Sequence, residues 1–195
     1  MPSPTPSSPQ PGRASSRHIY RGRVLSLRVD ELDVEGGRSV RREVVEHPGA
    51  VTIIAFDDQE RLLLVRQYRH PVGRDLLELP AGTFDPGDDP ETCALRELQE
   101  ETGYRPGHLE RLGGFYLAPG YCTEYQNVFL ATGLTKSRLP PDEDERIELV
   151  PLPLEEVLRM VEAGEIEDAK TAAALLLYLR HRGTSPARPA PAERP

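Results

Sequence analysis

Apolar positions along the chain follow two periods, which predict strands and helices in alternation. Residues 20–34 and 39–47 alternate apolar and polar positions on either side of a glycine pair and predict two antiparallel strands. Apolar runs predict the remaining strands, at residues 50–56, 61–69, 111–118, 124–132 and 146–152. Helical spacing predicts helices at residues 90–102, 153–164 and 168–182. Strands and helices interleaved in this order predict an α/β fold in which a mixed sheet lies between helices.

Composition separates the middle of the chain from its ends. Of the 195 residues, 37% are hydrophobic and 29% are charged, which is typical of one globular domain. Residues 1–18 and 183–195 are rich in proline, serine and alanine and carry few apolar side chains, so we expect both to be disordered tails. The folded domain is then residues 19–182, and residues 19–47 supply its N-terminal strands.

Charge and cysteine content narrow the class of protein. Residues 19–180 carry 19 basic and 31 acidic side chains, a net charge of −12, which argues against nucleic-acid binding. No apolar run is long enough to span a membrane or to form the core of a signal peptide. The two cysteines, Cys93 and Cys122, are expected to be free thiols in a reducing cytoplasm.

The stretch GTFDPGDDPETCALRELQEETGY, residues 82–104, concentrates acidic side chains on one predicted helix. Asp89 suits a helix N-cap and Pro90 the first helical position. Gly103 suits the left-handed residue just beyond the last turn. At roughly 100° per residue, three acids of this helix share an arc of about 100°; they are Glu97, Glu100 and Glu101.

An acidic run of this kind has two interpretations. A solvated face is the simpler one, but like charges at these offsets cost a few tenths of a kcal/mol each, and solvated helices usually place Lys or Arg there. A divalent cation reverses the sign of that cost, and carboxylates without His or Cys beside them suit a hard ion such as Mg²⁺. The turn formed by Gly82, Pro86 and Gly87 could bring a backbone carbonyl, such as that of Ala81, to the same ion.

The same stretch resembles the Nudix box, in which a glycine, five residues, an acid and seven residues precede Arg-Glu-aliphatic-x-Glu-Glu-x-Gly-aliphatic. The matching positions are Gly82, Asp88, Arg96, Glu97, Leu98, Gln99, Glu100, Glu101, Thr102, Gly103 and Tyr104. Asp88 stands where the family has Glu, and Tyr104 stands where an aliphatic residue is usual. The resemblance implies an α/β/α sandwich with a mixed sheet, extended at the N-terminus by antiparallel strands.

The resemblance also implies a reaction, the hydrolysis of a diphosphate joined to a nucleoside, with Mg²⁺ or Mn²⁺. The ions would neutralise the diphosphate and orient an attacking water. Their ligands would be Glu97, Glu101, the carbonyl of Ala81 and Glu100. Arg96 would hold the helix acids in place by ion pairing.

Features outside the box resemble the ADP-ribose pyrophosphatases over about residues 19–182. They are RQYRHP at 66–71, ELPAG at 78–82 and Pro119 in APGYCTE. The substrate would then be ADP-ribose and the products AMP and ribose 5-phosphate. The subfamily likeness also implies a homodimer, in which the N-terminal strands of one subunit reach the other's substrate pocket.

Pro119 and four further residues are candidates for substrate binding. Guanidinium forks of Arg66 and Arg69 suit phosphate oxygens or ribose hydroxyls, although surface arginines often pair with local acids instead. Glu78 could accept a hydrogen bond from a ribose hydroxyl or bind a supporting arginine. Tyr20 resembles the N-terminal aromatic residue that stacks on adenine in relatives, whereas in an unknown chain such a tyrosine more often packs within a strand.

A general base is expected outside the box, because glutamates that ligate a metal have a lowered proton affinity. In the relatives a mobile acidic loop supplies the base, and Glu143 matches that position best. Glu145 and Glu124 are the alternatives, and four acids in one loop are often simply solvated.

Other functions compete with ADP-ribose hydrolysis. The nearest is a pyrophosphatase for another nucleoside diphosphate sugar, because two or three pocket residues could switch the sugar. A non-catalytic ADP-ribose sensor would lack the intact acids and would need a DNA-binding module. An enzyme that removes damaged nucleoside triphosphates is a third alternative.

Overall fold

The computed structural model describes residues 12–34, 36–140 and 146–184. Within these ranges the chain divides into two compact units. The first unit comprises the chain as far as Pro48 together with Tyr116–Glu124. The second unit comprises Gly49–Phe115 and the chain from Tyr125 onward, and it holds most of the internal contacts.

The first unit is built on a three-stranded antiparallel sheet, in the order β1 (Gly12–Arg21), β2 (Ser26–Val34) and β3 (Arg38–Glu46). The expected pairing of the two N-terminal stretches is confirmed by the register of β2 and β3. Gly36 and Gly37 both have positive φ in the turn between these strands, as the glycine pair predicted.

The start of this sheet differs from the prediction in two ways. The predicted strand 20–34 is interrupted by a tight turn, in which the amide of Gly22 donates to the carbonyl of Leu25 at 2.9 Å. The sequence did not indicate this turn because apolar residues continue on both sides of it. Strand β1 also begins within the expected tail, where Ser16 Oγ donates to Asp30 Oδ1 at 2.7 Å and His18 Nε2 lies 2.7 Å from Glu46 Oε2. Side-chain pairing of this kind compensates for the few apolar residues of that segment.

The second unit contains a mixed sheet, as expected. Its four strands are β7 (Ala81–Thr83), β4 (Ala50–Ala55), β10 (Tyr125–Thr132) and β9 (His108–Tyr116), in that order. Strand β4 pairs parallel to β10 and antiparallel to β7. A three-stranded sheet has the order β12 (Ile147–Pro153), β5 (Arg61–Arg69) and β6 (Arg74–Glu78), and β11 (Thr135–Lys136) pairs with β8 (Tyr104–Arg105). The short strands β6, β7, β8 and β11 were not predicted, because two to five residues show no clear period.

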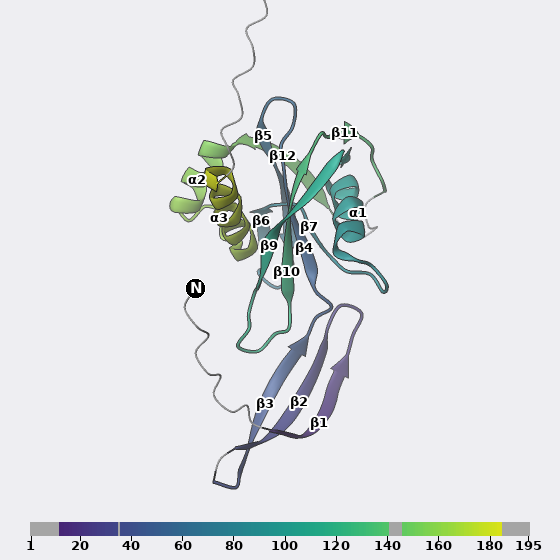
Figure 1. Ribbon diagram of the computed structural model, residues 1–195, viewed down its shortest axis with the longest axis vertical. Helices are drawn as coiled ribbons and strands as arrows, with labels where there is room; N and C mark the ends of the chain where they lie inside the picture. The colour runs from purple at the N-terminus through teal and green to yellow at the C-terminus, as the bar shows by residue number, and fades with distance from the viewer. Residues whose placement is uncertain (1–11, 35, 141–145, 185–195) are drawn as a thin grey trace, which may run out of the picture. The chain divides into compact units, whose positions relative to one another are not determined.

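Helices cover both faces of the strands in this unit (Figure 1). Helix α1 (Pro90–Thr102) lies on one side, and α2 (Leu154–Glu162) with α3 (Ala169–Thr184) lies on the other. Alternation along β4 explains the two layers, because Val51, Ile53 and Ala55 belong to the core cluster of α1, whereas Ile54 belongs to the cluster of α2 and α3. The α/β/α sandwich is thereby confirmed.

Two expectations about the whole chain can be compared with this structure. Both cysteines are free, Cys93 buried and Cys122 partly buried. Of the helices in the described ranges, none combines the length and the apolar character that crossing a membrane requires.

Candidate active site

Helix α1 is fixed at both ends by the residues that the sequence indicated. Asp89 Oδ1 accepts hydrogen bonds from the amides of Glu91 and Thr92, at 2.9 and 3.0 Å. Gly103 follows the last turn with φ of 78°. The apolar face of the helix, including Cys93, Ala94 and Leu98, is fully buried. This packing fixes the rotation of the helix and therefore the direction of its acidic face.

Two of the acids lie against the backbone just before the helix. Oε2 of Glu101 accepts a hydrogen bond from the amide of Ala81 at 3.0 Å. The carboxylate of Glu97 packs on Gly82 so closely that a Cβ at that position would lie 1.8 Å from its Cδ atom. A side chain at position 82 would therefore displace the Glu97 carboxylate, and both acids are held beside the carbonyl-bearing segment 81–82.

Arg96 connects the acids of the helix to the preceding loop. Its Nη1 atom lies 2.7 Å from Glu97 Oε1 and 3.1 Å from Glu100 Oε2. Its Nη2 atom donates to the carbonyl of Thr83 at 3.2 Å. Burial alone would lower the pKa of Arg96, but the charge of Glu97 and the other acids outweighs burial and raises the pKa above its ordinary value. The guanidinium therefore stays charged and offsets the repulsion between the glutamates.

Asp88, which replaces the usual glutamate of the box, still reaches Arg96 despite its shorter side chain. Oδ2 of Asp88 lies 3.3 Å from Arg96 Nη2 and accepts a hydrogen bond from the amide of Asp85 at 3.2 Å. The loop brings the aspartate close enough to compensate for the missing methylene group.

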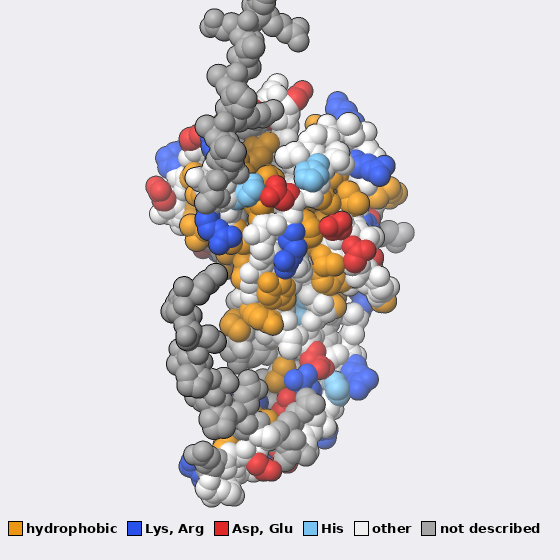
Figure 2. All heavy atoms as spheres, viewed as in Figure 1, with side chains coloured by type: hydrophobic (Ala, Val, Ile, Leu, Met, Phe, Trp, Pro, Cys, Tyr) orange, Lys and Arg blue, Asp and Glu red, His pale blue; other side chains and the backbone are white. Residues whose placement is uncertain are grey.

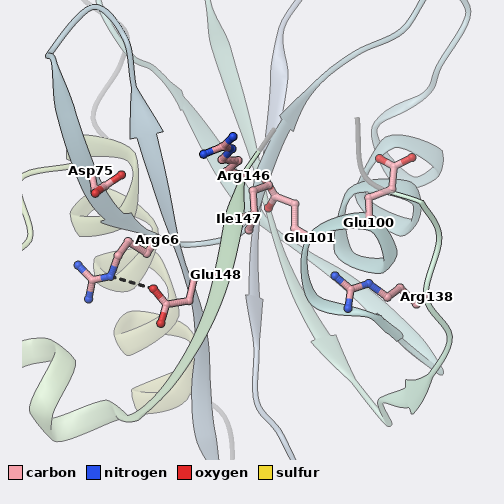
Figure 3. A pocket seen from close by; sticks show the side chains of 8 residues that line it. All are labelled: Arg66, Asp75, Glu100, Glu101, Arg138, Arg146, Ile147 and Glu148. Carbon is pink, nitrogen blue, oxygen red and sulfur yellow. Dashed lines mark ion pairs between the residues drawn. The ribbon is translucent and has the colours of Figure 1, made fainter. Parts of the chain in front are cut away.

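A pocket of about 450 Å³ opens beside the helix acids (Figure 3). In this view Arg66, Asp75 and Glu148 lie on one side of it and Glu100 and Arg138 on the other. Its lining comprises Arg66, Asp75, Glu100, Glu101, Arg138, Arg146, Ile147 and Glu148. The pocket therefore combines four carboxylates, two of them from the box helix, with three guanidinium groups, so an anionic ligand would need bound cations as well as the arginines.

The donors around residues 81–101 fit a hard divalent cation. The carboxylates of Glu97 and Glu101 lie against the backbone of residues 81–82. The stretch 81–101 contains no His, and the thiol of Cys93 is buried. In the described ranges no three acidic, His or Cys side chains converge on a single point. A Mg²⁺-type ion does not require such a cage, because it keeps several waters and shares positions with phosphate.

Other candidate residues occupy different environments. Arg66 lines the pocket, and its Nε atom lies 3.5 Å from Glu148 Oε2, so it pairs with a local acid, and its role in substrate binding stays a prediction. Glu78 is 1% exposed and binds Arg69 through both carboxylate oxygens, which favours the supporting-arginine interpretation over contact with a ribose. Tyr20 is 59% exposed.

Five candidates either belong to the first unit or lie outside the described residues. Tyr20 and Pro119 are in the first unit, as is Glu124, one alternative for the general base. Glu143 and Glu145 lie outside the described residues. Their proposed roles stay predictions.

Sequence reasoning missed several residues that the fold brings to this region. Arg138 and Arg146 line the pocket, and Lys170 binds Glu78, yet no motif marked the two arginines. Lys170 lies in the stretch predicted as a helix at residues 168–182, in which the sequence suggested no role for it.

Comparison with known proteins gives consistent matches. The NUDIX domain matches residues 46–175. The ADP-ribose pyrophosphatase of Bacillus subtilis (strain 168) is 40% identical over 163 residues, which cover 83% of this chain and 88% of that protein. The ADP-ribose pyrophosphatase of Mycobacterium tuberculosis is 41% identical over 165 residues, covering 83% and 80%. The crystal structure of an ADP compounds hydrolase superposes with a TM-score of 0.80 at 26% identity, covering 92% of this chain and 97% of that one.

Proposed function

This chain belongs to the NUDIX family and is a hydrolase, and we propose that it converts ADP-ribose and water to AMP and ribose 5-phosphate. The observation that carries the proposal is the pocket whose lining includes Glu100 and Glu101 of the box helix together with three arginines. The names of the two relatives at 40% and 41% identity support ADP-ribose as the substrate.

Each group of residues has a separate task in this proposal. Arg66, Arg138 and Arg146, which line the pocket, would bind phosphate oxygens or ribose hydroxyls of the substrate, because planar guanidinium groups match those acceptors. Arg69, whose guanidinium is held by Glu78 and is partly exposed, would make a further contact of this kind. Arg96 would position the helix acids, since it already pairs with Glu97 and Glu100. The acids of the box helix would then lie beside the diphosphate, with Glu100 on the same side of the pocket as Arg138.

Enzymes of this family use a divalent cation, and we propose Mg²⁺, for which Mn²⁺ can substitute. Glu97, Glu101 and the carbonyl of Ala81 would hold it, with Glu100 as a further ligand. When bound, such an ion neutralises the diphosphate and lowers the pKa of bound water. The close packing of Glu97 on Gly82 and the bond from Ala81 to Glu101 support this ligand set.

The purified protein is expected to hydrolyse ADP-ribose with Mg²⁺ or Mn²⁺ and to be inactive in EDTA. A site rich in carboxylates repels a diphosphate unless cations reverse the local charge. Release of AMP is measured for ADP-ribose, GDP-mannose, UDP-glucose, diadenosine polyphosphates and dGTP analogues. Faster turnover of another nucleotide sugar would reassign the substrate, and no turnover of any compound would contradict an enzymatic role.

The enzyme is also expected to be a homodimer, in which the N-terminal strands complete the partner's substrate pocket. Exposed apolar side chains near the β1–β2 turn support this, because Ile19, Tyr20, Val24 and Leu25 are each more than 40% exposed. Light scattering at assay concentration measures the mass. A fully active monomer would rule out the shared pocket.

A cytoplasmic location and the absence of a nucleic-acid partner complete the proposal. The two free cysteines fit a reducing compartment. On the face drawn in Figure 2, basic side chains lie among acidic and apolar ones and form no continuous patch.

A further inference from the structure

Lys170 is one of only two lysines in the chain, and it is buried in the first turn of α3. Its ammonium group forms ion pairs with Glu78 and Asp168, the second at 3.0 Å. Glu78 is 1% exposed and Lys170 is 8% exposed. Burying these charges is costly unless each one is paired, so the arrangement depends on all of its members.

The same carboxylate of Glu78 holds the guanidinium of Arg69. Arg69 Nε donates to Oε1 at 2.8 Å and Nη2 donates to Oε2 at 2.6 Å. Within the described part of the chain, Nη1 of Arg69 makes no hydrogen bond, and 36% of the side chain is exposed. The edge of the Arg69 guanidinium that carries Nε and Nη2 is therefore held by Glu78, and the edge that carries Nη1 is open to a ligand.

Lys170 helps to keep Glu78 ionised, so that its carboxylate can hold the guanidinium of Arg69. Burial alone would raise the pKa of Glu78, but the hydrogen bond from Arg69 and the charge of Lys170 outweigh burial and lower the pKa. Lys170 shares Oε2 of Glu78 with Arg69 Nη2, so the ammonium and guanidinium groups are fixed relative to each other.

The first turn of α3 is also tied to the backbone that leads into the box. Thr171 Oγ1 accepts a hydrogen bond from the amide of Leu79 at 2.8 Å and donates to Asp168 Oδ2 at 2.6 Å. Two residues after Leu79, the amide of Ala81 donates to Glu101. Residues 78–81 are thus held between the start of α3 and the acids of α1.

We propose that Lys170 is a positioning residue for substrate binding, which acts through Glu78 to orient the guanidinium of Arg69 toward the nucleoside diphosphate. This rests on the proposed function, in which Arg69 contacts the substrate. The competing explanation is that Lys170 only stabilises the docking of α3. The two explanations differ in whether loss of the lysine charge affects ligand binding only when Arg69 is present.

The test is a double-mutant cycle of Lys170→Met and Arg69→Ala in the full-length chain. Binding of the α,β-methylene analogue of ADP-ribose with Mg²⁺ is measured by calorimetry, because this analogue has no hydrolysable P–O–P bond. Lys170→Met is expected to raise Kd about tenfold, the order expected for a weakened charge-assisted hydrogen bond. In the Arg69→Ala background the same change should leave Kd unaltered.

Two matched controls separate positioning from stability. Lys136→Met removes the other lysine, which is exposed on β11. Thr171→Val removes the hydrogen bonds that the hydroxyl makes with Leu79 and Asp168 without changing the charge. Both should leave Kd within about twofold of wild type, although Thr171→Val lowers Tm because a buried amide loses its acceptor. Lys170→Arg keeps the charge and should recover most of the affinity for the analogue. It replaces Lys170→Met in the binding measurement if Lys170→Met does not fold.

The outcomes distinguish this inference from the proposed function. An unchanged Kd for Lys170→Met, an equal effect in both backgrounds, or an equal effect of Thr171→Val would each overturn the positioning role. Wild-type binding without turnover of ADP-ribose would reject only the proposed reaction. Failure of the wild-type protein to bind the analogue at all would overturn both.

Discussion

Glu97→Gln and Glu101→Gln are each expected to lower kcat for ADP-ribose by about 10²-fold or more. A divalent cation contributes several kcal/mol of charge stabilisation in the transition state, and about 3 kcal/mol corresponds to that factor. Each substitution removes one of the anionic ligands proposed for the cation. The comparison is made at saturating Mg²⁺ and substrate, so that kcat is measured separately from KM.

The fold should survive both substitutions. Glutamine keeps a carbonyl oxygen that can accept from the amide of Ala81 or from Arg96, so the free energy of unfolding should change by about 1 kcal/mol or less. Glu91→Gln is a matched control, because Glu91 is exposed in the first turn of the same helix. A large fall in Tm without metal for either variant would favour a structural role, as would activity equal to that of the Glu91 variant.

Local signals made the box helix predictable from the sequence. Its N-cap, its first residue and its C-cap are each determined by one residue and its neighbours, namely Asp89, Pro90 and Gly103. The spacing of the glutamates then determines which side chains share a face. The same reasoning failed at residues 22–25, because the apolar residues beyond Gly22 concealed the turn.

The rest of the site depends on contacts between distant segments, which no local pattern records. Arg138 reaches the pocket because residues 137–139 dock on the end of α1. The amide of Ser137 donates to the carbonyl of Gly103 at 2.9 Å, and Gln99 Nε2 donates to Ser137 Oγ at 3.0 Å. Lys170 likewise meets Glu78 across 92 residues of sequence. Glu78 and Lys170 are both buried, and this burial indicates a shared role that the sequence around either residue does not indicate by itself.

The general base is expected to be Glu143, so Glu143→Gln should lower kcat by about 10²–10⁴-fold, the range typical of a lost general base. Carboxylates that ligate a cation have their lone pairs engaged and their proton affinity lowered, so the acids of α1 are poor acceptors for the proton of the attacking water. A carboxylate from a loop that closes over the substrate would accept that proton and exclude bulk water. KM and metal affinity should change little, because Glu143 would contact neither the ion nor the ground-state substrate. The measurement is kcat across the pH range at saturating Mg²⁺.

Glu124→Gln and Glu145→Gln are the matched controls, and both should reduce kcat much less than Glu143→Gln. Glu145→Gln tests whether loss of any acid from this stretch is enough to lower kcat, because Glu145 lies in the same acidic stretch, PPDEDERIEL, as Glu143. Glu124 tests the other loop, since its backbone carbonyl accepts from the amide of Leu117 at 3.1 Å and the carboxylate is not required for that bond. If Glu143→Gln keeps near wild-type kcat at every pH while one of the other two variants does not, the role of base moves to that residue. A loss spread evenly over all three would indicate instead that the acids act together through their charge, since a single proton acceptor requires one carboxylate within hydrogen-bond reach of the water.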